Sequence, residues 1–309
     1  MKTYILYFFQ SLLLLLLTPL FIGILKNLKA FFRGYTGSSI IQPYYLLIKL
    51  FNKARVISKT SSIITKITPI ISLSSTMAVM FIIPVFYTGK DNTFGNIFLI
   101  IFVLGISKFL TTLLGLDCAS TFGEMGSSRE QFISMMAEPV MFILVTYLYM
   151  ETRTFNIYNI SATNNLLTKY GVAHLIAALA FFVLIIIENS RMPVDNPETH
   201  LELTMIHEAM ILDLSGKDLG LIELASYSKL IIFLTIFINC FFPYGIATSI
   251  TFISISRAFL FYIVKLFLCL ISISLIESFI AKFKLFKIPE ILTAAFSISL
   301  VAIALNYLV

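Results

Sequence analysis

The sequence has little charge and few cysteines. Only 12% of its 309 residues are Asp, Glu, Lys or Arg, and the three cysteines, Cys118, Cys240 and Cys269, lie far apart without a C-x-x-C pair. Iron–sulfur and structural zinc sites need clustered thiolates or imidazoles. We therefore expect no metal centre and no bound cofactor on this chain, and we expect the cysteines to be buried as small apolar residues.

Signatures of catalysis and of nucleotide binding are also missing. His207-Glu208 is followed by Ala-Met-Ile and lacks the second histidine of an H-E-x-x-H zinc protease. Gly216-Lys217 lacks the upstream glycine and the following hydroxyl of a P-loop, and neither G-x-G-x-x-G nor G-x-S-x-G occurs. We expect no catalytic residue and no nucleotide site.

What the sequence does have is long apolar runs. Hydrophobic residues make up 59% of the chain, and a bilayer core about 30 Å thick takes about 20 apolar residues of helix to cross. Eight runs qualify, at residues 4–26, 67–88, 94–116, 132–150, 169–189, 222–244, 257–280 and 288–308. The strands of a membrane barrel would alternate instead. We predict an all-α polytopic membrane protein with a single integral domain over residues 1–309.

The distribution of basic residues predicts an orientation. The connections after the first, third, fifth and seventh runs hold 14 of the 22 lysines and arginines. Basic residues favour the cytoplasmic side of a membrane. We expect both termini outside a bacterial or archaeal cytoplasmic membrane and the long connections in the cytoplasm. This placement accounts for the net charge of +6 without a nucleic-acid partner.

Two of these connections contain features of their own. In the first, Pro43 suits the first turn of a helix, and Leu46, Leu47 and Leu50 form an apolar stripe beside Lys49. This pattern is typical of an amphipathic helix on the membrane surface. The second connection, residues 117–131, is rich in Gly and Ser, which favours a compact loop whose backbone can approach another surface closely.

The third connection carries most of the unusual charge. Glu188 ends the fifth run, and Arg191, Asp195, Glu198 and Glu202 follow within 14 residues. Ionisable groups at a membrane edge are costly and are often functional. Asn196 and Pro197 would cap and begin a new helix over residues 197–214, on which Glu198 and Glu202 share one face.

A few charges lie within the runs themselves. Glu138 precedes Pro139 in the fourth run, and Lys108 and Lys265 lie in the third and seventh. Buried carboxylates have raised pKa values and can exchange protons near neutral pH. We expect Glu138 and Glu188 to carry protons, and Lys108 and Lys265 are candidates for the same relay or for ion pairs.

These residues carry a family resemblance. The pattern Glu188-x-x-Arg191-x-Pro193-x-Asp195-x-x-Glu198-x-x-x-Glu202 resembles the acidic loop of the membrane subunit that joins the two arms of respiratory complex I. Its continuation through His207-Glu208 is more similar to the fourth subunit of formate hydrogenlyase and to its relatives in hydrogenase-4 and other membrane-bound [NiFe] hydrogenases. His200 stands where complex I has another glutamate, which favours the hydrogenases.

The resemblance implies a role for the chain and for its residues. It implies a membrane-anchoring and proton-coupling subunit, beneath hydrogenase large and small iron–sulfur subunits that carry the NiFe and iron–sulfur centres, and beside antiporter-like membrane subunits. The implied coupling residues are Glu188, Asp195, Glu198 and Glu202, with Arg191 as their counter-charge, and Glu138 is implied to pass protons from them into the membrane. The implied contacts with the peripheral arm are Gln42, Tyr44, Lys49, Asp117, Arg129, Glu130, His200, His207 and Glu208.

Two alternatives stay open at this point. One is the equivalent arm-joining subunit of a proton-pumping NADH:quinone oxidoreductase. The other is a stand-alone secondary ion transporter, which predicts internal repeats and broken spans at matching positions. No such repeat is evident in the sequence.

Overall fold

The fold is helical throughout the part of the chain that the structure describes. The computed structural model describes residues 2–58, 61–89, 95–163, 166–195 and 205–308. Its elements are α1 (Lys2–Phe32), α2 (Gln42–Phe51), α3 (Ile63–Ile82), α4 (Ile97–Asp117), α5 (Thr121–Thr152), α6 (Ile157–Ala162), α7 (Leu166–Glu188), α8 (His207–Ile211), α9 (Gly216–Phe241), α10 (Phe252–Phe279), the 3₁₀ turn η1 (Leu285–Lys287) and α11 (Ile288–Leu308). The predicted all-α class is confirmed.

Eight of the described helices are long and apolar enough to cross a membrane, as predicted. Hydrocarbon offers no partner for backbone N–H and C=O groups, so apolar spans satisfy them within helices. Polar side chains set several helix starts. Ser62, Asn96, Ser120 and Thr251 each accept a hydrogen bond from a backbone N–H in the first turn of the helix that follows. The chain is therefore an integral membrane protein.

The fourth span is longer than the sequence indicated. The expected loop over residues 117–131 is wrong, because α5 begins at Thr121 and only residues 118–120 connect it to α4. The glycines serve close packing instead of a turn. A Cβ on Gly115 would lie 2.3 Å from Ser127 Oγ, and one on Gly126 would lie 2.8 Å from the carbonyl oxygen of Ile206. Small residues let membrane helices approach closely.

The predicted helix over residues 197–214 is also wrong in its described part. Residues 205–214 contain only the five-residue α8, and α9 begins at Gly216, earlier than the expected residue 222. The carbonyl oxygens of Lys53 and Ala54 lie against Gly216. The capping residues Asn196 and Pro197, with Glu198, His200 and Glu202, lie outside the described residues.

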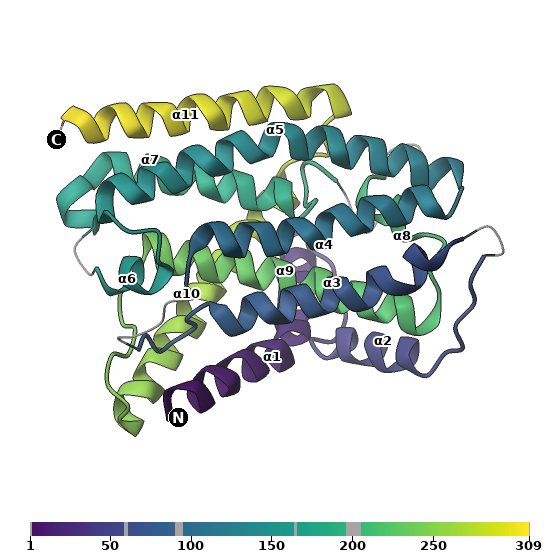
Figure 1. The fold of residues 1–309 in the computed structure, drawn as a ribbon, viewed down its shortest axis with the longest axis horizontal. Helices are drawn as coiled ribbons and strands as arrows, with labels where there is room; N and C mark the ends of the chain where they lie inside the picture. The colour runs from purple at the N-terminus through teal and green to yellow at the C-terminus, as the bar shows by residue number, and fades with distance from the viewer. Residues whose placement is uncertain (1, 59–60, 90–94, 164–165, 196–204, 309) are drawn as a thin grey trace.

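Helix α9 forms the centre of the bundle. Of its most apolar stretch 72% is buried, against 28% for α10 and for α11. Figure 1 shows α11 along one edge beside α5 and α7, with α1 and α2 at the opposite edge. The predicted amphipathic helix is confirmed as α2, which buries Pro43 and Leu47 and leaves Tyr45 and Ile48 exposed.

The spans alternate in direction, so the connections fall at two ends of the bundle. We call the end that carries α2, α8 and residues 189–195 the polar end. The other end carries α6, and both termini of the chain lie toward it. Helix α7 ends at Glu188, where the long charged connection begins, and Glu188 lies beside Lys229 of α9.

Candidate functional site

Four charged side chains from four different helices meet near the polar end. Lys108 Nζ on α4 lies 3.0 Å from Glu188 Oε2 on α7 and 3.3 Å from Glu130 Oε1 on α5. Lys229 Nζ on α9 lies 3.7 Å from Glu188 Oε2 and donates a hydrogen bond of 2.7 Å to the carbonyl oxygen of Glu188. We call these residues the four-charge cluster.

The positive and negative charges of the four-charge cluster are equal in number, and its side chains are largely buried. The side chains of Lys108, Glu130, Glu188 and Lys229 are 13%, 5%, 12% and 17% exposed. Two ammonium groups offset two carboxylates, which limits the cost of burying four charges. Because the charges are interdependent, a proton gained or lost by any one of them changes the free energy of protonation of the others.

Two members of the four-charge cluster, Glu130 and Lys229, were not predicted to belong to such a cluster. Glu130 was expected at the contact with a peripheral arm, but its side chain is buried between Lys108 and Ser190, whose hydroxyl donates to Glu130 Oε2 at 3.4 Å. Lys229 was not selected as a site residue at all. A signal was present, since Lys108 and Lys229 both lie mid-span and two buried cations require anions nearby.

The charged connection supplies a second group of ion pairs. Asp195 Oδ1 lies 2.7 Å from Lys282 Nζ, and its Oδ2 accepts hydrogen bonds from the backbone N–H groups of Ile206 and His207 at 2.9 and 3.2 Å. Asp195 is 1% exposed. It therefore holds the two described parts of this connection together across residues 196–204.

Arg191 has a carboxylate partner that the sequence did not suggest. Its Nη1 lies 3.6 Å from Glu277 Oε1 on α10, and Glu277 Oε2 lies 3.0 Å from Lys29 Nζ on α1. The partners of Glu277 come from segments that are distant in the sequence, and its side chain is fully buried. The counter-charges of Glu188 are Lys108 and Lys229 instead.

Three cavities with shared walls connect these groups. The first, of about 400 Å³, is lined by Arg191, Asp195, His207, Glu208 and Glu223 among others. The second, of about 40 Å³, is lined by all members of the four-charge cluster and shares its Ser190, Ser226 and His207 walls with the first. Even the second is larger than the roughly 10–15 Å³ that one water molecule needs.

The third cavity leads sideways to Glu138. It measures about 120 Å³ and is lined by Lys108, Glu188 and Lys229, which it shares with the second cavity, and by Glu138. Glu138 is exposed on the flank of α5. The structure therefore brings Glu138 and Glu188 to one cavity, and three cavities with shared lining residues extend from Asp195 and Glu208 to a lateral face of the bundle.

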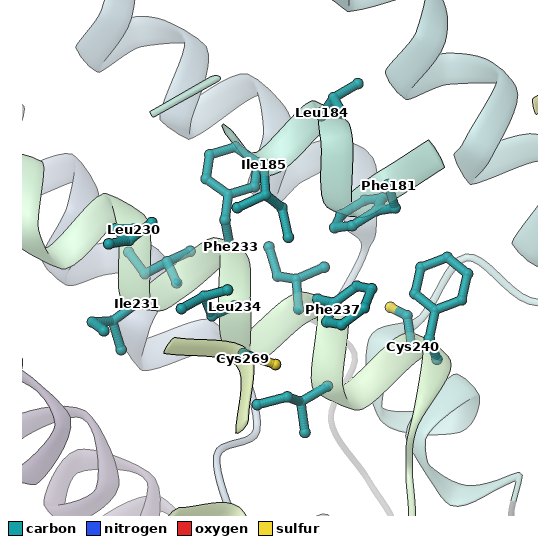
Figure 2. Close-up of a cluster of buried hydrophobic side chains, with 14 of the residues drawn as sticks. Phe181, Leu184, Ile185, Leu230, Ile231, Phe233, Leu234, Phe237, Cys240 and Cys269 are labelled. Atoms are coloured by element: carbon teal, nitrogen blue, oxygen red, sulfur yellow. The ribbon is translucent and has the colours of Figure 1, made fainter. Parts of the chain in front are cut away.

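Along the bundle axis, apolar side chains of α7 and α9 follow the four-charge cluster. Figure 2 shows Phe181, Leu184 and Ile185 of α7 packed on Phe233 and Phe237 of α9. The rings of Phe181 and Phe237 stack with centroids 6.2 Å apart. Among the residues labelled in Figure 2, this apolar layer contains no carboxylate, lysine or histidine. The polar side chains described next to the four-charge cluster continue instead toward Glu138.

Two residues of the connection titrate abnormally. Burial, reinforced by Glu223 and Asp195, raises the pKa of Glu208 to about 7. Burial lowers the pKa of His207 below its ordinary value, so its imidazole is neutral at pH 7. Both line the first cavity, where a carboxyl that exchanges protons near neutral pH is suited to proton entry.

The other predicted contact residues lie at the polar end in different settings. Gln42 and Lys49 are exposed on α2, and the Tyr44 hydroxyl donates to the carbonyl oxygen of Leu16 at 2.5 Å. Asp117 Oδ2 binds the Thr65 hydroxyl at 2.6 Å and the N-terminus of α3. Arg129 Nη1 donates to the carbonyl oxygen of Met205 at 3.1 Å.

Lys265 lies apart from these groups. Its ammonium donates to the carbonyl oxygens of Phe242 and Tyr244, at the far end of α9. A second buried acid–base pair lies at that same end. His174 Nδ1 is 2.9 Å from Glu151 Oε2, and His174 Nε2 is 3.0 Å from the carbonyl oxygen of Phe241. The apolar layer separates this pair from the four-charge cluster.

Within the described residues, no group of three or more His, Cys, Asp or Glu side chains could hold a metal ion. All three cysteines are buried, and none is in a disulfide bond. The titratable groups that the site brings together are carboxyl, ammonium and imidazole groups, which can exchange protons.

Comparison with known proteins agrees with the resemblance predicted from residues 188–208. The profile of a family described as NADH dehydrogenase matches residues 4–307. Hydrogenase-4 component C of Escherichia coli (strain K12) is 26% identical over 294 residues, covering 95% of this chain and 92% of that protein. Formate hydrogenlyase subunit 4 of the same organism is 26% identical over 295 residues, covering 95% of each.

A solved structure supports the fold. A chain of the membrane-bound sulfane sulfur reductase, an archaeal respiratory membrane complex, matches with a TM-score of 0.82 at 15% identity, covering 97% of this chain and 99% of that chain. The fold is therefore shared with a chain of that membrane complex.

Proposed function

Because this chain belongs to the NADH dehydrogenase family, as its match over residues 4–307 shows, we propose that it is the membrane-anchoring and proton-coupling subunit of a multi-subunit membrane-bound hydrogenase. Its similarity to formate hydrogenlyase subunit 4 and hydrogenase-4 component C supports this class of complex. The partners are hydrogenase large and small iron–sulfur subunits, which carry the NiFe and iron–sulfur centres, and antiporter-like membrane subunits. This chain itself binds none of these centres.

The observation that carries the proposal is the connected series of cavities from Glu208 to Glu138. The series begins at the end where a peripheral arm would dock, passes the four-charge cluster and ends on a lateral face. A stand-alone transporter needs access to both sides of the membrane. Here the series of cavities ends at Glu138 on the lateral face of α5. This position suits a subunit that passes protons or charge to a neighbouring membrane subunit.

Coupling follows from electrostatics. A change of one unit charge in an arm docked over Asp195 and Glu208 acts on groups that bulk water screens poorly. Each 1.4 kcal/mol of interaction shifts a pKa by about one unit. Glu208 exchanges a proton most readily near its pKa of about 7. The altered occupancy is passed to Glu188 through the shared cavity walls and then to Glu138.

The proposed orientation places the polar end in the cytoplasm and both termini outside. The basic residues Lys49, Lys53 and Arg55 at the polar end support it, since such residues remain on the cytoplasmic side.

The experiment is purification of the complex from solubilised membranes through an affinity tag on this chain, followed by mass spectrometry and an assay of hydrogen evolution. We expect a [NiFe] hydrogenase large subunit and small iron–sulfur subunits in stoichiometric amounts, together with hydrogenase activity. Recovery of NADH-oxidising and quinone-reducing subunits, or of this chain alone, would contradict the proposal.

A further inference from the structure

An apolar groove lies at the end of the bundle opposite the four-charge cluster. It runs between α7, α9 and α10 and has a volume of about 540 Å³. Helix α10 packs more on α1 than on α9, which leaves the space open. Phe237 and Cys269, both labelled in Figure 2, line its inner wall. Its rim carries Leu175, Leu179 and Leu268, which are 49%, 56% and 58% exposed.

Among the described residues that line the groove, Lys265 is the one cation. The ammonium of Lys265 donates to the carbonyl oxygen of Phe242 at 2.7 Å and to that of Tyr244. Both carbonyls follow the end of α9 at Phe241, so the ammonium lies where a membrane span ends. No carboxylate of the described residues lies within 4.0 Å of Lys265 to form an ion pair.

The apolar groove and the ammonium of Lys265 together indicate the class of ligand that the site would bind. The carbonyls orient Lys265 but carry no net charge, so its positive charge still favours an anion. The groove beside it is walled by hydrocarbon side chains and falls within the roughly 300–1,000 Å³ of typical ligand sites. A molecule with one anionic group and a long apolar chain satisfies both parts.

We propose that this groove binds an anionic phospholipid, with its phosphate on Lys265 and an acyl chain along Leu175, Leu179 and Leu268. Basic sites between membrane helices bind lipid headgroups in this way. A helix of a partner subunit fits the groove less well, because helix interfaces in membranes favour small residues, and the exposed rim is made of leucines. The site is separate from the proposed coupling path and does not depend on it.

The test is lipid retention by the intact complex, purified in mild detergent through a tag on this chain. Anionic phospholipid per complex is measured by native mass spectrometry and by extraction. Lys265→Gln removes the charge, and Leu179→Trp fills the groove without touching Lys265. Arg257→Gln removes an exposed cation on the same helix and is the matched control.

We expect Lys265→Gln and Leu179→Trp each to lose a phospholipid that wild type, Lys265→Arg and Arg257→Gln retain. Added inorganic phosphate should not displace it, because the acyl chain supplies part of the affinity. Equal lipid content in all variants would overturn the proposal. So would lipid loss in Lys265→Gln alone, displacement by free phosphate, or loss of a protein subunit in place of the lipid.

Discussion

The charge balance of the four-charge cluster makes a quantitative prediction about Lys108. Lys108→Met removes the ammonium that lies 3.0 Å from Glu188 and 3.3 Å from Glu130, and it leaves two carboxylates with Lys229 alone. Breaking a buried ion pair by removing one partner costs about 3–5 kcal/mol. We expect Lys108→Met to lower the stability of the purified protein by an amount in that range.

A compensating substitution should recover most of this loss. Lys108→Met with Glu130→Gln restores neutrality and leaves the Glu188–Lys229 pair at 3.7 Å. Replacing a buried ion pair with apolar or neutral groups is often close to neutral in free energy. We expect a coupling free energy at the upper end of the roughly 0.5–3 kcal/mol seen for residues in contact.

The companion double variant, Lys108→Met with Glu188→Gln, is the control. It is also neutral, but it leaves Glu130 and Lys229 without the Glu188 carboxylate between them, so it should recover less. Thermal unfolding of the tagged complex at fixed pH in one detergent measures all variants. If Lys108→Met/Glu130→Gln were no more stable than Lys108→Met, the reasoning from charge balance would be refuted.

Three further predictions concern groups on and off the proposed path. Glu138→Gln should reduce ion translocation but change stability by less than about 0.5 kcal/mol, because the side chain is exposed; unchanged translocation would remove Glu138 from the path. Folded Glu208 keeps its proton up to about pH 7, whereas the unfolded chain loses it near the ordinary value of 4.5. Stability should therefore fall as pH rises through this window, and Glu208→Gln should flatten that part of a Tm–pH curve; identical curves would contradict the assignment. Glu151→Ala leaves buried His174 without its carboxylate and should cost about 3–5 kcal/mol, with translocation per turnover of the surviving complex unchanged; a specific loss of translocation would place this pair on the path.

The sequence predicted the fold well because hydrocarbon leaves few choices. A run of about 20 apolar residues must be helical to satisfy its backbone, so all eight spans were predictable. The prediction of a loop over residues 117–131 was wrong because it relied on their Gly and Ser content. The same small residues that favour turns in water permit close helix packing in a membrane. Only the contacts of Gly115 and Gly126 distinguish the two outcomes.

The site was predicted in outline but not in its pairings. Glu188 and Lys108 stood out as charges at membrane depth, and the structure places them 3.0 Å apart. The partners of Arg191 could not be predicted, because Glu277 is 86 residues away in sequence and meets it only through the packing of α10 on α1. Glu130 seemed a surface residue only because α5 was expected to begin after it.

The most direct test of the account is ion translocation by the assembled complex in proteoliposomes carrying Glu188→Gln together with Lys229→Met. This double variant is neutral and keeps the Lys108–Glu130 pair at 3.3 Å, so the complex should assemble and its redox turnover should persist. The account predicts that turnover then no longer builds a transmembrane ion gradient. A gradient equal to that of wild type at equal turnover would contradict the claim that the four-charge cluster couples the two processes.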